Sequence, residues 1–209
     1  DRNMSNKKNI IIVIESLLLA AAVGLGIWWY VHNNVVREVE KTFEDGSTYK
    51  GEWLAGRMHG RGVLTLADGE VYEGGFVEGR REGDGKVKRA DGAEYEGLWL
   101  DDRYHGEGRY TSSKGNVYEG EWQHGRLPEG RLKSRDWTYE GQFEGMSPSG
   151  VGVTEYNDGR TYAGHWYRGF KQGLGRFDHP DGKVEFGFWD QGSLMRSGKK
   201  EFRTGSKVY

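Results

Sequence analysis

The chain has 209 residues, of which 35% are hydrophobic and 35 are glycine. Its 30 Lys and Arg residues nearly balance its 32 Asp and Glu residues, so it lacks the basic excess expected of a nucleic-acid-binding protein. Cysteine is absent, which excludes disulfides, cysteine nucleophiles and thiolate metal sites. The apolar material is mainly aromatic, with 8 Trp, 12 Tyr and 8 Phe. Large rings with few aliphatic partners suit a thin sheet better than a two-layer core.

The chain begins with a short basic segment, residues 1–8, followed at once by an apolar run. Residues 1–3 precede Met4, which we interpret as the native start. At about 1.5 Å per residue, a helix over residues 9–31 is long enough to cross a bilayer of about 30 Å. Two tryptophans and a tyrosine close the run, as in an aromatic belt at a membrane surface. We therefore expect one transmembrane helix over residues 9–31.

A cleaved signal peptide is the alternative, because Ala20-Ala21-Ala22 offers a cleavage site. Signal-peptide cores are usually about 7–15 residues long, shorter than this run. The two lysines before the run favour a cytoplasmic N terminus by the positive-inside rule. The expected location is then the cell membrane, with a single pass and the rest of the chain outside the cytoplasm. A short basic start followed directly by an anchor is typical of a bacterial protein.

Three residues of the apolar run are candidate contacts with a partner in the membrane. Glu15 places a carboxylate in the run, where it either approaches the nearby interface or binds a partner. Ala20 and Gly24 stand four residues apart, a small-residue spacing that lets two helices approach closely. Homodimerisation through these helices is one hypothesis. Residues 32–44 then either extend the helix as a linker or form an N-terminal cap strand.

From residue 45 onward the sequence repeats one pattern, first seen as Tyr49, Gly51 and Trp53. Copies follow one another every 23 residues, except that the fifth begins 21 residues after the fourth. Spacing at i, i+2 and i+4 puts the two rings and the glycine on one face of a strand. The further copies are Tyr72-Gly74-Phe76, Tyr95-Gly97-Trp99, Tyr118-Gly120-Trp122, Tyr139-Gly141-Phe143, Tyr162-Gly164-Trp166 and the degenerate Glu185-Gly187-Trp189.

Each copy is predicted to form one β-hairpin. Glycines cluster after the first strand, where the chain must turn, and a second short run follows, as at residues 63–66. A lone hairpin is marginal in water, so each copy needs its neighbours to cover its aromatic face. Asp-Gly pairs then turn the chain into the next copy, and they occur at Asp45-Gly46, Asp68-Gly69, Asp91-Gly92, Asp158-Gly159 and Asp181-Gly182.

The pattern Tyr-x-Gly-x-Trp, then Gly, then His-Gly-x-Gly resembles the MORN repeat (membrane occupation and recognition nexus). The resemblance covers residues 42–192 and implies an elongated, twisted single-layer sheet that acts as a scaffold or membrane-associated adaptor. The expected fold is mainly β, an elongated single-layer antiparallel sheet of tandem MORN hairpins preceded by one transmembrane α-helix. Residues 45–192 form the predicted rod, with six full copies and one degenerate copy. Residues 193–209 form the predicted C-terminal cap and tail.

The sequence departs from this pattern in the third to fifth copies. Asp102 replaces the mid-repeat glycine of the third copy, and Pro128-Glu129 disrupts the His-Gly pair of the fourth. The fifth copy begins two residues early. We therefore expect a kink or bulge between about Gly125 and Gly150.

The aromatic row is the first candidate surface for a ligand or partner. A one-layer sheet cannot hide both faces, so part of the row is expected to stay open as a ligand groove or dimer face. The row consists of Tyr49, Trp53, Tyr72, Phe76, Tyr95, Trp99, Tyr118, Trp122, Tyr139, Phe143, Tyr162 and Trp166.

The second candidate surface is an arginine row, eight residues after the tyrosine of each of the first four copies. One interpretation is that it pairs with the column one residue after the tyrosine and only solvates the rod. The other is that it binds anionic headgroups or an acidic partner. The arginines are Arg57, Arg80, Arg103 and Arg126, and the neighbouring column is Lys50, Glu73, Glu96 and Glu119.

No arrangement of residues predicts catalysis. His59 and His105 hold the same repeat position two copies apart, about 19 Å at about 4.8 Å per strand, too far to share a metal. The carboxylates recur with the repeat and do not converge as an acid–base pair. We therefore expect no catalytic residue, metal or cofactor, and no enzyme.

Two functions remain open from the sequence. The favoured one is a membrane-anchored scaffold whose rod binds a partner protein, such as an envelope-building enzyme, near the bilayer. The alternative is a module that binds lipid headgroups or a polymer through the aromatic groove and the arginine row.

Overall fold

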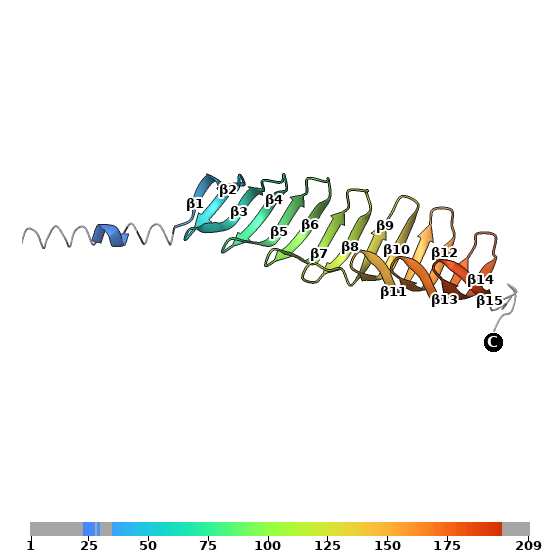
Figure 1. Ribbon diagram of the computed structural model, residues 1–209. Coiled ribbons are helices and arrows are strands. Elements are labelled where there is room, and N and C mark those ends of the chain that lie inside the picture. The colour runs from blue at the N-terminus through green and yellow to red at the C-terminus, as the bar shows by residue number, and fades with distance from the viewer. Residues whose placement is uncertain (1–22, 28, 30–34, 198–209) are drawn as a thin grey trace, which may run out of the picture.

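The structure is a computed structural model that describes residues 23–27, 29 and 35–197. Fifteen strands form one antiparallel sheet, in which every strand pairs with the next one in sequence. Figure 1 shows these strands as one layer that runs as an elongated, twisting rod. The single antiparallel sheet agrees with the hairpins predicted from the repeats.

In the regular repeats the strands alternate in length, because each repeat contributes a shorter strand that carries the two rings and a longer one that returns. Their bounds are β1 Arg37–Thr42, β2 Thr48–Leu54, β3 Arg57–Thr65, β4 Val71–Val77, β5 Arg80–Lys88, β6 Glu94–Leu100, β7 Arg103–Thr111, β8 Val117–Trp122, β9 Glu129–Lys133, β10 Trp137–Glu144, β11 Ser147–Tyr156, β12 Thr161–Tyr167, β13 Phe170–Asp178, β14 Val184–Asp190 and β15 Ser193–Ser197.

The prediction of a transmembrane helix is wrong. Residues 23–27 and 29 are helical. Within residues 23–27, 29 and 35–197, no helix is both long and apolar enough to cross a bilayer. With this finding, the predicted single-pass location in a bacterial cell membrane, N terminus inside and rod outside, is also corrected.

Most of the apolar run lies outside the described residues. This applies to the predicted partner contacts Glu15 and Ala20. Gly24 lies in the short helical segment, and an added Cβ there would meet nothing within 4 Å. Contact between these three residues and a partner stays a prediction. In the following segment β1 pairs with β2 from Arg37↔Trp53 to Thr42↔Thr48, which corresponds to the cap-strand alternative.

A ladder of paired glycines runs along the middle of the sheet, and tyrosine rings lie on it. Gly51 pairs with Gly62, and Gly62 pairs with Gly74. An ideal Cβ on Gly62 would stand 2.7 Å from Cζ of Tyr49, so any other side chain would collide with the ring. The single layer therefore obtains its core by laying rings directly on its own backbone.

Hydrogen bonds hold the rings in place. The Tyr49 hydroxyl donates to the carbonyl of Glu52 at 2.7 Å, and other repeat tyrosines make the same bond three residues on. Tryptophan indoles instead reach the preceding hairpin, as where Trp99 Nε1 donates to the Gly85 carbonyl at 3.1 Å. Each repeat is thus tied both to itself and to the repeat before it.

Two kinds of turn alternate along the rod. The turn within a repeat has two residues with positive φ, as in Ala55 (49°) and Gly56 (81°), the geometry that suits tight hairpins. The predicted Asp-Gly turns join the repeats and have positive φ only at the glycine, as at Gly69 (91°). The Asp68 carboxylate there accepts the Glu70 N–H at 3.0 Å, a local bond that favours the turn.

The fourth repeat is irregular, and its irregular part overlaps the start of the interval, Gly125 to Gly150, where a kink or bulge was expected. Strands β8 and β9 pair only from Val117 to Glu119, and beyond them an isolated bridge joins Gln123 to Arg126. Leu127 is 1% exposed, and its Cδ1 lies 3.0 Å from an ideal Cβ on Gly120. Leucine here fills the space that a tyrosine ring fills in regular repeats.

Candidate docking surface

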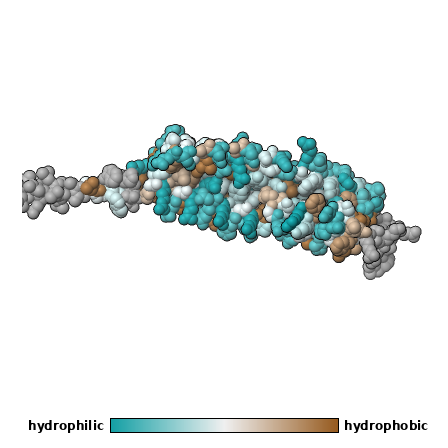
Figure 2. Space-filling view, in the orientation of Figure 1, coloured by the Kyte–Doolittle hydropathy of each residue, from teal (hydrophilic) through white to brown (hydrophobic). Residues whose placement is uncertain are grey.

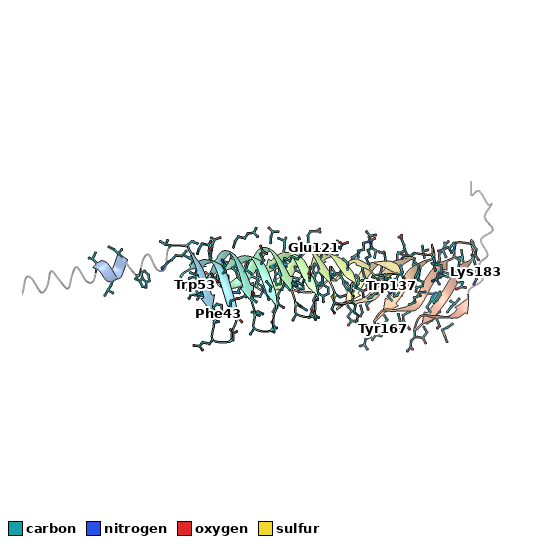
Figure 3. All side chains as sticks on the ribbon, turned by 90° about the horizontal axis from the view of Figure 1, so that it is seen from above. Phe43, Trp53, Glu121, Trp137, Tyr167 and Lys183 are labelled. Atoms are coloured by element: carbon teal, nitrogen blue, oxygen red, sulfur yellow. The ribbon has the colours of Figure 1, made fainter. Side chains whose placement is uncertain are left out.

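The sheet has two unlike faces. The aromatic face carries the tyrosine and tryptophan rings, and the outer face carries the side chains between them, such as Lys50 and Glu52. Alternation along each strand produces this division. Figure 3 shows how side chains project on both sides of the sheet, with Tyr167 directed away from it.

The predicted aromatic row forms the core. All of its members except the half-buried Trp53 are buried, with exposures between 0% and 9%. Burial raises the pKa of Tyr49, Tyr72 and Tyr162 to about 12. Rings from adjacent repeats meet edge to face, as with Tyr72 and Trp99 at 5.0 Å. Binding of a ligand by this row stays a prediction, and Trp53 is the member with the most open surface.

The arginine row does not pair with the column predicted for it. Arg57 lies 3.7 Å from Glu78, and Arg80 forms an ion pair with Asp101; both acids belong to the turn of the following repeat. In the other column, Glu119 pairs with Arg109 at 2.8 Å. The two columns lie at different heights along the strands, because Arg57 lies opposite Leu54 beside the turn, whereas Lys50 lies opposite Val63. The predicted cross-hairpin pairing is therefore wrong.

The other members of these rows are distributed as follows. Arg103 and Arg126 make no ion pair with an acidic side chain of the described residues. Glu96 lies 3.5 Å from Lys86.

The His105 ring lies 5.5 Å from that of His124. No group of three or more His, Cys, Asp or Glu side chains that could hold a metal occurs in the part of the chain that the structure describes.

The outer face changes character along the rod. Beside the paired glycines, β5 places Asp84 and Lys86, whereas β14 places Phe186 and Phe188. In Figure 2, brown residues lie at the C-terminal end of the rod as well as near its N-terminal end. We call the apolar side chains of β11, β13 and β14 on this face the apolar patch; they are Val151, Val153, Leu174, Val184, Phe186 and Phe188, with exposures of 41–55%.

The register brings the members of the apolar patch together. Leu174 lies directly opposite Phe188 on the neighbouring strand. Val151 and Val153 lie two strands from Leu174, on β11, and face His165 and Ala163 of the intervening strand β12. Arg176 interrupts the patch, but its guanidinium is held by Asp178, with Nε to Oδ2 at 2.8 Å. The patch thus spans four strands, with Ala163 and His165 of β12 between its two parts.

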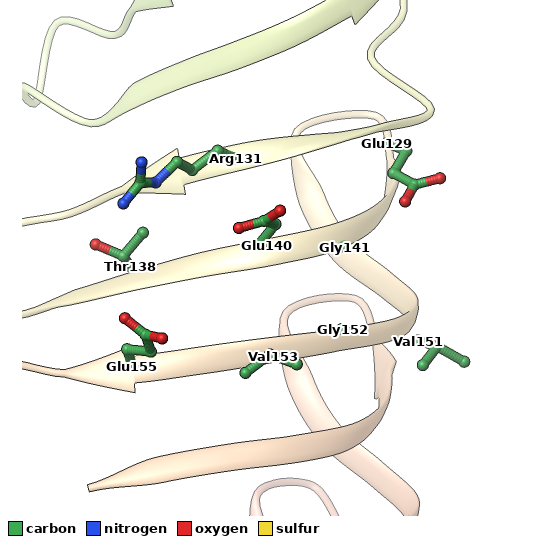
Figure 4. Close-up of a pocket in the computed structure, with 9 residues that line it drawn as sticks. All are labelled: Glu129, Arg131, Thr138, Glu140, Gly141, Val151, Gly152, Val153 and Glu155. Carbon is green, nitrogen blue, oxygen red and sulfur yellow. The ribbon is translucent and has the colours of Figure 1, made fainter. Parts of the chain in front are cut away.

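A groove adjoins the apolar patch on the same face. Its volume is about 560 Å³, and Gly141 and Gly152 lie on its floor (Figure 4). Val151 and Val153 belong to both the groove and the patch. We call it the acidic groove, because its polar lining is Glu129, Arg131, Thr138, Glu140 and Glu155.

Comparison with protein families identifies the repeats. The model of the MORN repeat matches residues 49–71, 72–94, 95–117, 118–127 and 162–184. This chain is a MORN-repeat protein. The MORN match becomes partial at residues 118–127, where the structure has its irregular fourth repeat. A search of curated proteins found no match.

Three solved structures are similar to the MORN rod. One is the TCP domain of SAS-4 (dCPAP) of Drosophila melanogaster in complex with a proline-rich motif of Ana2 (dSTIL), 13% identical, covering 72% of this chain and 88% of that one, with a TM-score of 0.44. A mutant TCP10 domain of Danio rerio CPAP is 20% identical over 70% and 80% of the two chains, with a TM-score of 0.36. The CPAP G-box domain is 14% identical over 73% and 93%, with a TM-score of 0.26.

Sequence reasoning missed both the apolar patch and the acidic groove. Recurrence in every MORN copy identifies positions that all repeats share, whereas these features depend on positions that change between copies. A signal was present in Val151, Val153, Phe186 and Phe188. They alternate with glycine where earlier copies carry charges, which indicates a strand with two apolar faces.

Proposed function

We propose that this MORN-repeat protein is a non-catalytic scaffold that binds a partner protein through the apolar patch and the acidic groove. The observation that carries the proposal is the exposed apolar patch on β11, β13 and β14, continuous with a groove of about 560 Å³. Contiguous apolar surface that is rimmed by polar residues marks interaction sites on soluble domains. The MORN match supports a repeat-based binding module.

The geometry favours a partner with a defined chemical character. Burying apolar surface contributes about 25 cal/mol per Å², so covering Phe186, Phe188 and Leu174 supplies the main attraction. The groove beside them presents Glu129, Glu140 and Glu155 with one arginine, an acidic surplus. Complementary charge sets orientation and specificity. The expected partner segment therefore carries apolar side chains followed by basic ones.

A second copy of the chain fits this surface less well. Two apolar patches would attract each other, but the acidic grooves beside them would then face each other or solvent without a basic partner, and like charges oppose association. The alternative of lipid or polymer binding by the arginine row rests on two of its four members, Arg103 and Arg126, which make no ion pair among the described residues. Arg57 and Arg80 each have an acidic partner within the rod.

Site-specific photocrosslinking tests the proposal. Benzoylphenylalanine placed at Phe186 should crosslink a partner from lysate, and the same group at Val71, an exposed outer-face position of β4, should not. Excess unmodified chain should compete for the product. The variant Phe188→Glu, which keeps the core intact, should fail to compete. Equal crosslinking from both positions, or competition by the variant, would refute a partner at the apolar patch.

A further inference from the structure

One position on the aromatic face varies widely between repeats. It lies opposite the second ring of each repeat, next to the two-residue turn. Most repeats fill it with an uncharged side chain, but two place a cation there. The residues, in chain order and with their ring partners, are Met58 (Trp53), Arg81 (Phe76), Tyr104 (Trp99), Pro148 (Phe143), Lys171 (Trp166) and Leu194 (Trp189).

Arg81 is neutralised within the rod. Its Nε donates to Oδ1 of Asp102 at 3.0 Å, and its Nη1 donates to Oε1 of Glu70 at 3.2 Å. The guanidinium lies over the Trp99 ring at 4.4 Å. Two carboxylates and a ring thus satisfy a cation that the aromatic face partly buries.

Lys171 lies among aromatic rings, as Arg81 does, but it lacks the two carboxylates that neutralise Arg81. Its ammonium lies 4.2 Å from the Phe177 centroid, 5.0 Å from that of Trp189 and 5.1 Å from that of Tyr162. The repeat positions of Asp102 and Glu70 are occupied here by Gly192 and Arg160. Both acids of the Arg81 cluster are therefore missing, and one is replaced by a cation.

No other acid takes their place in the described residues. Glu185 is the acid whose charge reaches Lys171, and it is paired with Lys183 and lies 3.6 Å from His179 Nε2. Arg160 is engaged by Asp158, with Nε to Oδ2 at 2.8 Å. Burial, together with the charge of Arg160, lowers the pKa of Lys171 to about 8, as expected for an ammonium without a counter-ion.

A cavity of about 310 Å³ opens beside Lys171. Its walls are Trp137, Tyr156, Trp166 and Phe170. Thr154 also lines it, is 1% exposed and has no hydrogen-bond partner for Oγ1. A buried hydroxyl normally finds a partner, so the cavity combines two unsatisfied polar groups with apolar walls, the usual features of a small-molecule site.

We propose that this cavity binds an organic carboxylate with an aromatic or apolar body. The carboxylate of the ligand pairs with Lys171, as the carboxylate of Asp102 pairs with Arg81. The apolar body of the ligand packs between Trp137, Tyr156 and Phe170. One free positive charge suits a monoanion better than a phosphate dianion. The cavity lies on the aromatic face, opposite the apolar patch. The proposal therefore stands independently of the proposed scaffold function.

Benzoate binding to the full chain tests the proposal. Calorimetry measures the affinity, and NMR of the lysine ammonium signals reports on Lys171. Benzoate should bind saturably and raise the pKa of Lys171, whereas neutral benzamide should not. In Lys171→Met, with the residue that the first repeat carries at this position, benzoate affinity should fall by about 30-fold or more, as on truncation of one member of a partly buried charge pair. Arg81→Met, the matched control, should leave benzoate affinity unchanged.

Gly192→Asp provides a second variant. It rebuilds the acid of the Arg81 cluster at a position where Asp102 tolerates a φ of 62°, and should compete with benzoate for Lys171. A blocked Phe-Glu-Phe peptide separates the two sources of the carboxylate, because tighter binding than benzoate indicates a protein side chain and weaker binding a free small acid. Absence of saturable binding by either probe, or full affinity in Lys171→Met, would overturn the proposal.

Discussion

Gly108 has no side chain because Tyr95 occupies the space where that side chain would stand. An ideal Cβ on Gly108 lies 2.7 Å from Cε2 and Cζ of Tyr95, and the hydroxyl is closer still. The hydroxyl in turn donates to the Leu98 carbonyl at 2.9 Å. The φ of Gly108 is not in the left-handed region, so the requirement for glycine at this position is steric.

The first prediction concerns this contact. Gly108→Ala should lower the free energy of unfolding by about 1–3 kcal/mol or more, because the Tyr95 ring must leave its place on the backbone. Urea denaturation followed by tryptophan fluorescence measures the change. In a Tyr95→Leu background the same substitution should cost less, since a smaller side chain relieves the overlap. Additive effects of the two substitutions would show that the ring does not explain the glycine.

The second prediction concerns the link between repeats. Trp99→Phe removes the indole donor from the Gly85 carbonyl and should cost about 1–3 kcal/mol, since the carbonyl then lacks its partner. Phe76 and Phe143 occupy the same repeat position, so the fold accommodates the smaller ring. Trp53, which follows the cap strand, makes no indole hydrogen bond within the described residues, and Trp53→Phe serves as the control. Equal losses in the two variants would contradict the assigned role of the bond.

The third prediction separates core from docking surface. Phe177→Ala, at a ring that is 5% exposed, should cost about 3–5 kcal/mol. Phe188→Ala, at a ring that is 51% exposed, should change stability by less than about 1 kcal/mol. Thermal unfolding of the two variants provides the comparison. A large loss at Phe188 would place the apolar patch in the core and remove it as a docking surface.

The fourth prediction follows from the depressed pKa of Lys171. Its pKa is about 8 in the fold against 10.5 for the ordinary group. Between these values the unfolded chain binds more protons, so the contribution of Lys171 to stability rises with pH from about 8 to 10.5 and is least favourable below pH 8. The repeat tyrosines, whose pKa values are raised, act in the opposite direction above pH 10.

Lys171→Met should therefore be more stable than the native chain at pH 7, by on the order of 1 kcal/mol after allowance for solvent screening. The difference in free energy of unfolding between the variant and the native chain should shrink by pH 10. Because both chains share the tyrosines, their contribution cancels in the difference. Urea denaturation of both chains at pH 6, 7, 9 and 10 measures this difference in stability. A pH-independent difference would mean that the ammonium is not desolvated.

The repeat determined what could be predicted of the fold. The spacing of Tyr49, Gly51 and Trp53 predicted strands, hairpins and one antiparallel sheet, because period-two alternation and turn residues act locally. The type of turn was predicted less well. The glycine clusters and the Asp-Gly pairs predicted both turns of each repeat, but not that the turn with positive φ at two residues would be the one at positions such as Ala55-Gly56.

The candidate surfaces were harder to predict, for a physical reason. A residue that recurs in every repeat serves the shared core, as the tyrosines do, so recurrence led away from the exposed positions. The pairing of Arg80 with Asp101 joins the turns of two consecutive repeats, and the spacing within a repeat does not show which turns lie side by side. Phe186, Phe188 and Lys171 gain their meaning only by comparison with what other repeats place at the same position.

Strong contacts in this sheet join only consecutive strands, which makes the protein a molecular ruler. Each repeat adds two strands, or about 9–10 Å of length at about 4.7–4.9 Å per strand. Removing one whole regular repeat, such as residues 95–117, would bring β1 and the Lys171 cavity closer by that amount and leave both faces in register. The number of copies thus sets the distance between whatever is held at the two ends.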